Sequence, residues 1–128
     1  MSGNIEDLIK YRIERAYETL EDARLLADSG RWNSCINRLY YASFYSVNAL
    51  LLKNKFRTYT HNGCKAKFHL EFVKTGIIDK SYGKLYSDLF DWRQEGDYAD
   101  YIAFDEATVT PLLEQTEKLI REIEKHLK

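Results

Sequence analysis

The most apolar stretch of the chain runs from Trp32 to Leu52, where a sequence that is 30% charged overall carries one charge, Arg38. Residues three, four and seven apart share one side of a helix. One side of this stretch collects Trp32, Cys35, Ile36, Leu39, Ser43, Val47 and Leu50, and the opposite side collects Tyr41, Tyr45 and Leu52. A helix that is apolar on two sides is normally buried on both. We therefore expect the central helix of a bundle, with its second side against more core or a second subunit.

The length of this stretch would suit a membrane span. However, it holds three Asn, three Ser and one Arg, which lipid would leave without hydrogen-bond partners. We therefore expect a soluble bundle and no membrane partner.

The segment before it has the pattern of an amphipathic helix over Asn4–Asp28. Its apolar residues recur at threes and fours: Ile5, Ile9, Ile13, Ala16, Leu20, Ala23 and Ala27. Asn4 can cap the first turn with its side chain, and Ser29-Gly30 suits a left-handed helix end. Because only this short turn separates the two helices, we expect them to form an antiparallel hairpin.

Three more helices are predicted after the central one. Their ranges are about Asn62–Gly76, Ser81–Arg93 with Gly96 after its end, and Asp105–Leu127. Pro111 lacks a donor N–H, so it should begin the regular part of the last helix or kink an earlier turn. The predicted class is all-α, an up-and-down bundle of about five helices that forms a single domain over residues 1–128.

Composition excludes some functions. The net charge is −1 and the sequence pI is about 6.3, so no bulk electrostatic drive toward nucleic acid or anionic membrane exists. The two cysteines, Cys35 and Cys64, fall on apolar helical stripes, as reduced thiols in a cytoplasm would. No apolar leader follows Met1. We expect a cytoplasmic protein that uses no cofactor.

Histidine and cysteine residues do cluster in one segment, as His61, Cys64 and His69. A zinc site needs four ligands, and Cys64 shares a helix stripe with Phe68 and Phe72. We therefore predict no metal site, and we interpret His61 as a surface or helix-capping residue.

A basic segment follows the central helix. Residues 53–74 contain six Lys or Arg against one acid, Glu71. If the protein binds phosphate or a nucleotide, the candidates are Lys53, Lys55, Arg57, Lys65 and Lys67. The alternative is that these cations form a solvated basic surface.

Arg93 is the most informative single residue. Between Asp88 and Glu106 it is one base among seven acids, and it falls on the same helix side as Tyr82, eleven residues earlier. An arginine on a buried side must find a carboxylate, a carbonyl or a phosphate. Pairing with Asp97 or Asp100 and a functional role both remain open.

Three segments resemble the HEPN-domain family, whose members are often encoded beside a minimal nucleotidyltransferase. They are RLYYASFYSVNALLL in the central helix, THNGCKAKFHLEFVKTGII after it, and RQEGDYADY at Arg93. The resemblance implies a helical bundle that forms a two-fold homodimer. It also implies that active members cut RNA with an Arg and a His about four to six residues apart. Arg93 matches the Arg, but Tyr98, Ala99 and Asp100 occupy the positions of the His.

Two hypotheses follow. The first is a non-enzymatic dimeric module of a toxin–antitoxin-like pair that binds a nucleotide or a nucleotidyltransferase partner. The second is a metal-independent ribonuclease that uses Arg93 with Asp97, Tyr98 or Asp100. Imidazole titrates near pH ~6.5, whereas Asp titrates near ~3.9 and Tyr near ~10, so the missing His favours the first.

Two further expectations complete the prediction. The resemblance implies that some members are silenced when the partner adenylylates a tyrosine shortly after the motif His, and Tyr98 and Tyr101 lie near that place. Tyr41, Tyr45 and Leu52 form the stripe through which we expect the dimer to pack, with Arg93 near its axis.

Overall fold

The computed structural model describes residues 4–98 and 103–128, with side chains for residues 4–94 and 103–128. Within these ranges the chain forms five α-helices and one short π-helix. They are α1 (Ile5–Asp28), α2 (Trp32–Lys53), α3 (His61–Phe68), η1 (His69–Val73), α4 (Lys80–Tyr98) and α5 (Glu106–Lys125). The all-α prediction of about five helices is confirmed.

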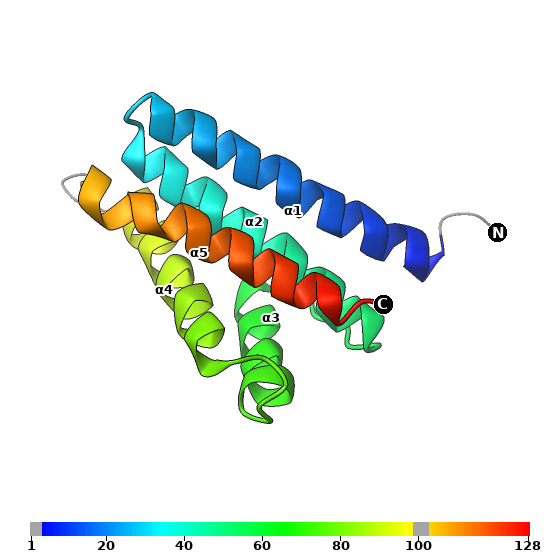
Figure 1. The fold of residues 1–128 in the computed structure, drawn as a ribbon. Helices are drawn as coiled ribbons and strands as arrows, with labels where there is room; N and C mark the ends of the chain where they lie inside the picture. The colour runs from blue at the N-terminus through cyan, green and yellow to red at the C-terminus, as the bar shows by residue number, and fades with distance from the viewer. Residues whose placement is uncertain (1–3, 99–102) are drawn as a thin grey trace.

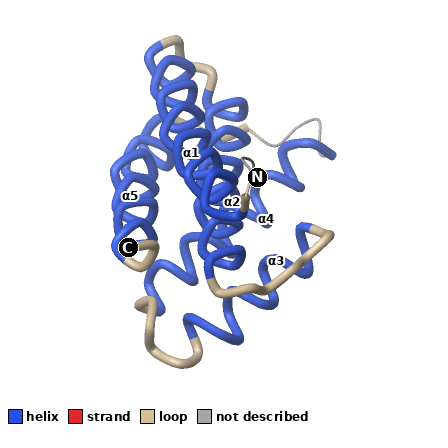
Figure 2. Tube along the Cα trace, turned by 90° about the vertical axis from the view of Figure 1, so that its right-hand side faces the viewer, coloured by secondary structure: helices blue, strands red, loops and turns tan. Residues whose placement is uncertain are grey.

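The helix α2 is the centre of the bundle, because it contacts each of the other four α-helices. In Figure 1, α1, α2 and α5 run alongside one another and each contacts the other two, while α3 and α4 extend away from these three long helices. Figure 2 shows α5 and α3 on opposite sides of the α1–α2 pair. This arrangement buries both sides of α2, as its two apolar stripes predict.

Helix α1 begins and ends as its sequence predicts. The Asn4 side chain accepts a hydrogen bond of 3.0 Å from the Asp7 backbone N–H and so caps the first turn. At the other end Gly30 adopts a φ of +70°, the left-handed conformation that glycine allows. The chain then reverses into α2, which makes the predicted hairpin.

Two predicted helix boundaries are wrong. The third helix is not one regular helix over 62–76: it begins at His61, behind Thr60, whose Oγ1 accepts from the Gly63 N–H at 2.8 Å, and becomes π-helical at His69. Helix α4 does not end at Arg93 but continues through Gly96 to Tyr98. A glycine inside a helix costs only about 1 kcal/mol relative to alanine, so Gly96 alone does not stop it.

The last helix begins earlier than Pro111. Asp105 caps it by accepting a 2.9 Å hydrogen bond from the Thr108 N–H, and the helix starts at Glu106. Pro111 therefore lies inside α5. It is exposed, so the backbone hydrogen bond that proline cannot donate is missing on the solvent side.

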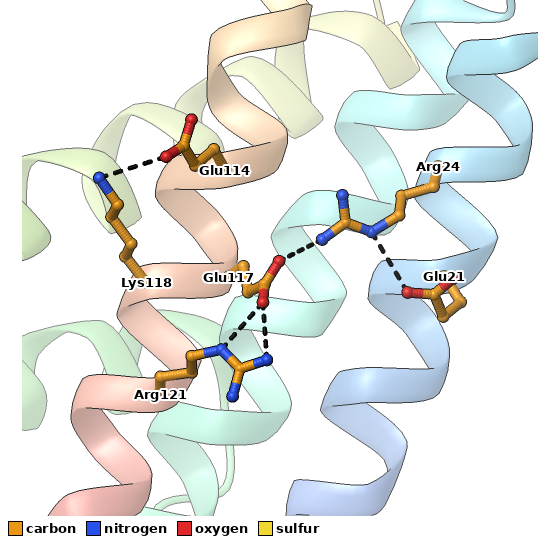
Figure 3. A network of polar contacts seen from close by, with 6 residues as sticks. All are labelled: Glu21, Arg24, Glu114, Glu117, Lys118 and Arg121. Atoms are coloured by element: carbon orange, nitrogen blue, oxygen red, sulfur yellow. Dashed lines mark hydrogen bonds and ion pairs between the residues drawn. The ribbon is translucent and has the colours of Figure 1, made fainter.

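Ion pairs on the outer surface connect α5 to α1. Glu117 on α5 accepts hydrogen bonds from Arg24 on α1 and from Arg121 one turn later, and Arg24 also contacts Glu21 (Figure 3). Surface pairs of this kind contribute about 0–1 kcal/mol each. The bundle is therefore held mainly by its apolar core, in which Tyr40, Phe68 and Tyr86 are among the largest fully buried side chains.

Candidate functional site

Arg93 lies against the aromatic side of α2. Its guanidinium carbon Cζ is 4.8 Å from the centre of the Tyr40 ring and 5.8 Å from that of Tyr41. A guanidinium within about 6 Å of an aromatic ring is attracted by the negative face of that ring. The side chain is half-buried. Arg93 thus packs on the inner side of α4, as its spacing from Tyr82 predicts.

His61 meets the same tyrosine from another direction. Its Nδ1 lies 2.7 Å from the Tyr40 hydroxyl, and its ring centre lies 4.5 Å from that of Phe44. The interpretation of His61 as a surface or capping residue was wrong, because Thr60 caps α3 and the imidazole is half-buried against α2. Tyr40 therefore joins two residues that are 32 positions apart into one Arg93–Tyr40–His61 cluster.

Both titratable partners in the cluster are neutral near pH 7. Burial lowers the pKa of His61, and the positive charge of Arg93 lowers it further. Burial raises the pKa of Tyr40, so its hydroxyl keeps its proton although Arg93 acts in the opposite direction. Tyr40 is also hydrogen-bonded to the deeply buried Tyr86, whose hydroxyl lies 3.9 Å from Cys64 Sγ. These contacts fix the position of the Tyr40 hydroxyl.

The tautomer of His61 decides what the cluster can do. If Tyr40 donates its proton to Nδ1, the neutral ring carries its proton on Nε2 and can donate it to an anion. If Nδ1–H donates to Tyr40 instead, Nε2 has a free lone pair and can accept a proton. Within the described residues Nε2 has no hydrogen-bond partner, so it remains available to a ligand.

The lowered pKa of His61 leads to a testable result. In Arg93→Gln the nearby positive charge is gone, so we expect the pKa of His61 to rise toward its ordinary value of about 6.5. NMR titration of the imidazole resonances measures this, with His126, remote in sequence on the last turn of the chain, as an internal reference. An unchanged His61 pKa in the variant would contradict the proximity of the two groups.

The same shift predicts how stability depends on pH. A histidine whose pKa is lower in the folded than in the unfolded state binds fewer protons when folded. Its contribution to the free energy of unfolding is therefore complete above about pH 6.5 and is lost as the pH falls. His69, which hydrogen-bonds to Ser87 at 2.8 Å, has a pKa lowered by burial and by Lys65, so it acts in the same direction. Urea denaturation between pH 5 and 8 should show this loss.

A second guanidinium lies beside Arg93. Arg38 Cζ is 5.0 Å from the centre of the Tyr41 ring, and its Nε and Nη2 donate to Asn37 Oδ1 at 3.0 and 2.7 Å. Arg38 and Arg93 line one cavity of about 360 Å3 together with Asn33, Ser34 and Trp92. Two arginines beside aromatic rings are suited to phosphate, because guanidinium binds it through paired hydrogen bonds.

The other predicted catalytic residues cannot be placed beside this cluster. Asp97 and Tyr98 belong to the last turn of α4, beyond the described side chains, and Asp100 and Tyr101 lie outside the described residues. Their catalytic and modification roles stay predictions.

The predicted basic residues fall into two groups. Lys53, Lys55 and Arg57 line one groove of about 690 Å3, in which Lys53 lies 3.8 Å from Glu6. Lys65 instead lies 4.0 Å from Asp91 and over the Phe90 ring, and Lys67 lies over the Phe56 ring. Phosphate binding by these five residues stays a prediction.

The predicted dimer stripe is half-buried. Tyr41, Tyr45 and Leu52 each keep part of their surface exposed while packing against the core. The rings of Tyr41 and Tyr45 are adjacent, with centres 6.2 Å apart, and the Arg15 guanidinium lies 5.2 Å over Tyr45. The dimer stays a prediction, and the stripe adjoins Arg93 through Tyr41.

None of the helices formed by residues 4–98 and 103–128 is long and apolar enough to cross a membrane. In the described chain, a helical bundle holds an arginine and an imidazole against one tyrosine of its central helix.

That class of bundle corresponds to a known family. The chain matches the model of the HEPN domain over residues 9–126 and belongs to that family. It is 42% identical over 120 residues to a UPF0332 protein of Thermotoga maritima, a match that covers 94% of this chain and 91% of the relative. A protein of Methanocaldococcus jannaschii named "Putative toxin MJ0605" is 32% identical, over 97% of this chain and 87% of the relative.

Proposed function

We propose that this protein is a dimeric HEPN module that binds the phosphate of a nucleotide or RNA at the Arg93–Tyr40–His61 cluster. In this proposal it is the toxin-type component of a pair whose other member is a minimal nucleotidyltransferase. The observation that carries the proposal is the position of Arg93, with its guanidinium over Tyr40 and Tyr41 and with Arg38 on the same cavity. The names of two relatives as toxins support the biological class.

The physical chemistry of the cluster supports a single-stranded ligand. Proteins that bind single strands combine cations that follow the phosphates with aromatic rings on which bases stack. Along one side of α2, the cation Arg38 is followed by the rings of Tyr41, Phe44 and Tyr45, and each of these side chains is half-exposed. A net charge of −1 gives no general attraction to phosphate, so binding depends on this local arrangement.

The dimer is part of the proposal and has its own test. The stripe of Tyr41, Tyr45 and Leu52 adjoins Arg93, so a two-fold interface through it would bring two copies of the cluster close together. We expect light scattering at tens of micromolar to give the mass of two chains, and Tyr45→Glu to give one. A monomeric wild-type protein at that concentration would contradict the predicted interface.

A second candidate function is metal-independent RNA cleavage. The observation that favours it is that His61 places a neutral imidazole on the same tyrosine as Arg93, although positions 98–100 lack the motif His. In this reaction a base takes the proton of a ribose 2′-OH, whose oxygen attacks phosphorus. The 5′ oxygen takes a proton from water as its bond to phosphorus breaks, which yields a 2′,3′-cyclic phosphate and a 5′-OH. His61 can be the base only when Nε2 carries the lone pair.

One experiment separates the two functions. Purified protein is mixed with labelled single-stranded RNA in EDTA, and binding is followed by fluorescence anisotropy while a gel reports cleavage. Under the first proposal RNA is bound intact, affinity falls as salt rises because phosphate contacts release counterions, and Arg38→Gln weakens binding.

The matched control is Lys118→Gln, which removes an exposed cation of α5 that pairs with Glu114. Cleavage that disappears in His61→Asn would establish the second function, and RNA that is neither bound nor cut would refute both.

A further inference from the structure

A separate small cavity also borders His61. It has a volume of about 200 Å3 and is lined by Arg12 from α1, Phe44 and Asn48 from α2, and Thr58, Tyr59, Thr60 and His61 from the segment that opens α3. Neither the motif resemblance nor the cluster described above assigns it a role. Its lining is mostly polar, with a guanidinium, an amide, three hydroxyl groups and an imidazole.

Arg12 is the unusual member of this lining. Its Nε is buried without a hydrogen-bond partner in the part of the chain that the structure describes, and no ion pair is formed by its guanidinium there. By contrast, Arg15 pairs with Glu18 at 3.1 Å and Arg24 with Glu21 at 3.2 Å on the same helix. A guanidinium that lines a cavity without an acidic partner attracts an anion into that cavity through its charge.

The sequence of α1 explains why Arg12 lacks an internal partner. Side chains three or four residues away on a helix are its neighbours, and at those positions stand Leu8, Ile9, Arg15 and Ala16. None of them is an acid. The residues found to line the cavity also include no acid, so nothing among the described side chains there competes with an incoming anion.

Several of the other polar lining groups can donate to an anion. Asn48 and Thr60 offer N–H and O–H groups, and His61 offers Nε2–H when Tyr40 donates to its Nδ1, whereas the Thr58 hydroxyl is hydrogen-bonded to Cys64. Thr60 is also the N-cap of α3, so the positive end of the dipole of that helix lies at the lining of the cavity. A guanidinium, a helix N-terminus and several neutral donors together form a phosphate-type site.

We infer that this cavity binds a terminal phosphate, a phosphomonoester at the end of an RNA strand or of a mononucleotide. The cavity is smaller than the ~300–1,000 Å3 of pockets that enclose whole small-molecule ligands, so it admits the phosphate while the sugar and base lie outside. Tyr59, which is 90% exposed, stands at its edge as a surface for stacking. This inference rests on the proposed function, because the rest of the ligand would extend past His61 to the phosphate-binding Arg93.

The test compares ligands that differ only at their ends. The probes are a uridine pentanucleotide with a 5′-phosphate, the same strand with a 3′-phosphate, the strand with two hydroxyl ends, and adenosine 5′-monophosphate beside adenosine. Binding to the full-length protein is measured by calorimetry at fixed salt. We expect about tenfold tighter binding of a phosphorylated end than of the hydroxyl end, because charge-assisted hydrogen bonds are among the stronger ones. A strand preference without a mononucleotide preference identifies RNA ends as the ligand, and the reverse identifies mononucleotides.

Three variants locate that preference. Arg12→Gln should bind phosphorylated and hydroxyl ends alike, while Lys10→Gln, an equal charge change on the exposed side of α1, should keep the preference. Thermal melting verifies that both variants are folded. No end preference in the wild type, or an unchanged preference in Arg12→Gln, overturns the inference. Arg93→Gln separates failure of the proposed function from failure of this inference. If this variant keeps the wild-type affinity for every strand, the proposed function is wrong, whatever the result for Arg12→Gln.

Discussion

Changing Arg93 to glutamine is expected to weaken RNA binding about 100-fold. The guanidinium can offer a phosphate two parallel charge-assisted hydrogen bonds, each worth about 1.5–3 kcal/mol, and every ~1.4 kcal/mol is a factor of ten in affinity. Glutamine keeps part of the length of the side chain but loses the charge and the forked geometry. Fluorescence anisotropy with a labelled single strand measures the change, and the slope of affinity against salt should fall as well.

The same substitution should change the stability of the fold far less. Arg93 is half-buried and lies over Tyr40 and Tyr41, and a cation over an aromatic ring is worth about 0.5–1 kcal/mol when partly exposed. We expect a loss of about 1 kcal/mol in urea denaturation, with Lys118→Gln as the control for a neutralised surface cation. A variant that binds RNA as well as the wild type would show that Arg93 is a structural residue.

Much of the fold could be predicted from the chain itself. The two apolar stripes of 32–52, the Asn4 cap and the Ser29-Gly30 turn are local signals, and each corresponds to an observed feature of α1 and α2. The π-helical residues 69–73 could not be predicted. A π-helix differs from an α-helix by hydrogen bonds that span five residues instead of four, and over one turn this hardly alters the pattern of apolar positions. The extension of α4 past Arg93 was not predicted, because Gly96 resembles a helix-ending glycine although it lies within the helix.

The candidate site was only half predictable. The spacing of Arg93 from Tyr82 indicates which side of α4 it occupies, and this is a local property. Its contact with Tyr40 and the approach of His61 depend on how α3 and α4 cross α2, and no periodicity encodes a crossing. The motif places an imidazole after Arg93, whereas the imidazole on Tyr40 belongs to His61, 32 residues before Arg93. Arg12 was equally hidden, although its lack of an acid at the neighbouring helical positions can be read from the sequence.

Tyr40 itself is expected to be the most sensitive residue of the cluster. Tyr40→Ala should lower the free energy of unfolding by about 3–5 kcal/mol, the usual cost of removing a buried aromatic ring. The side chain is fully buried, and its ring packs against Tyr86 and Phe90 with centres 5.9 and 5.8 Å apart. Urea denaturation measures the loss, and it should be accompanied by loss of RNA binding because Arg93 and His61 then lack their common support.

Tyr40→Phe separates the packing of the Tyr40 ring from the hydrogen bonds of its hydroxyl. It keeps the ring under Arg93 but removes the hydroxyl that holds His61 Nδ1 and contacts Tyr86, so we expect a loss of only about 1–2 kcal/mol. Affinity that depends on Arg93 should largely persist. The 15N resonances of His61 should show that its tautomer is no longer fixed, and with it the end preference of the Arg12 cavity should fall. A Tyr40→Phe protein as unstable as Tyr40→Ala would mean that the hydrogen bonds, and not the ring, hold α3 and α4 on α2.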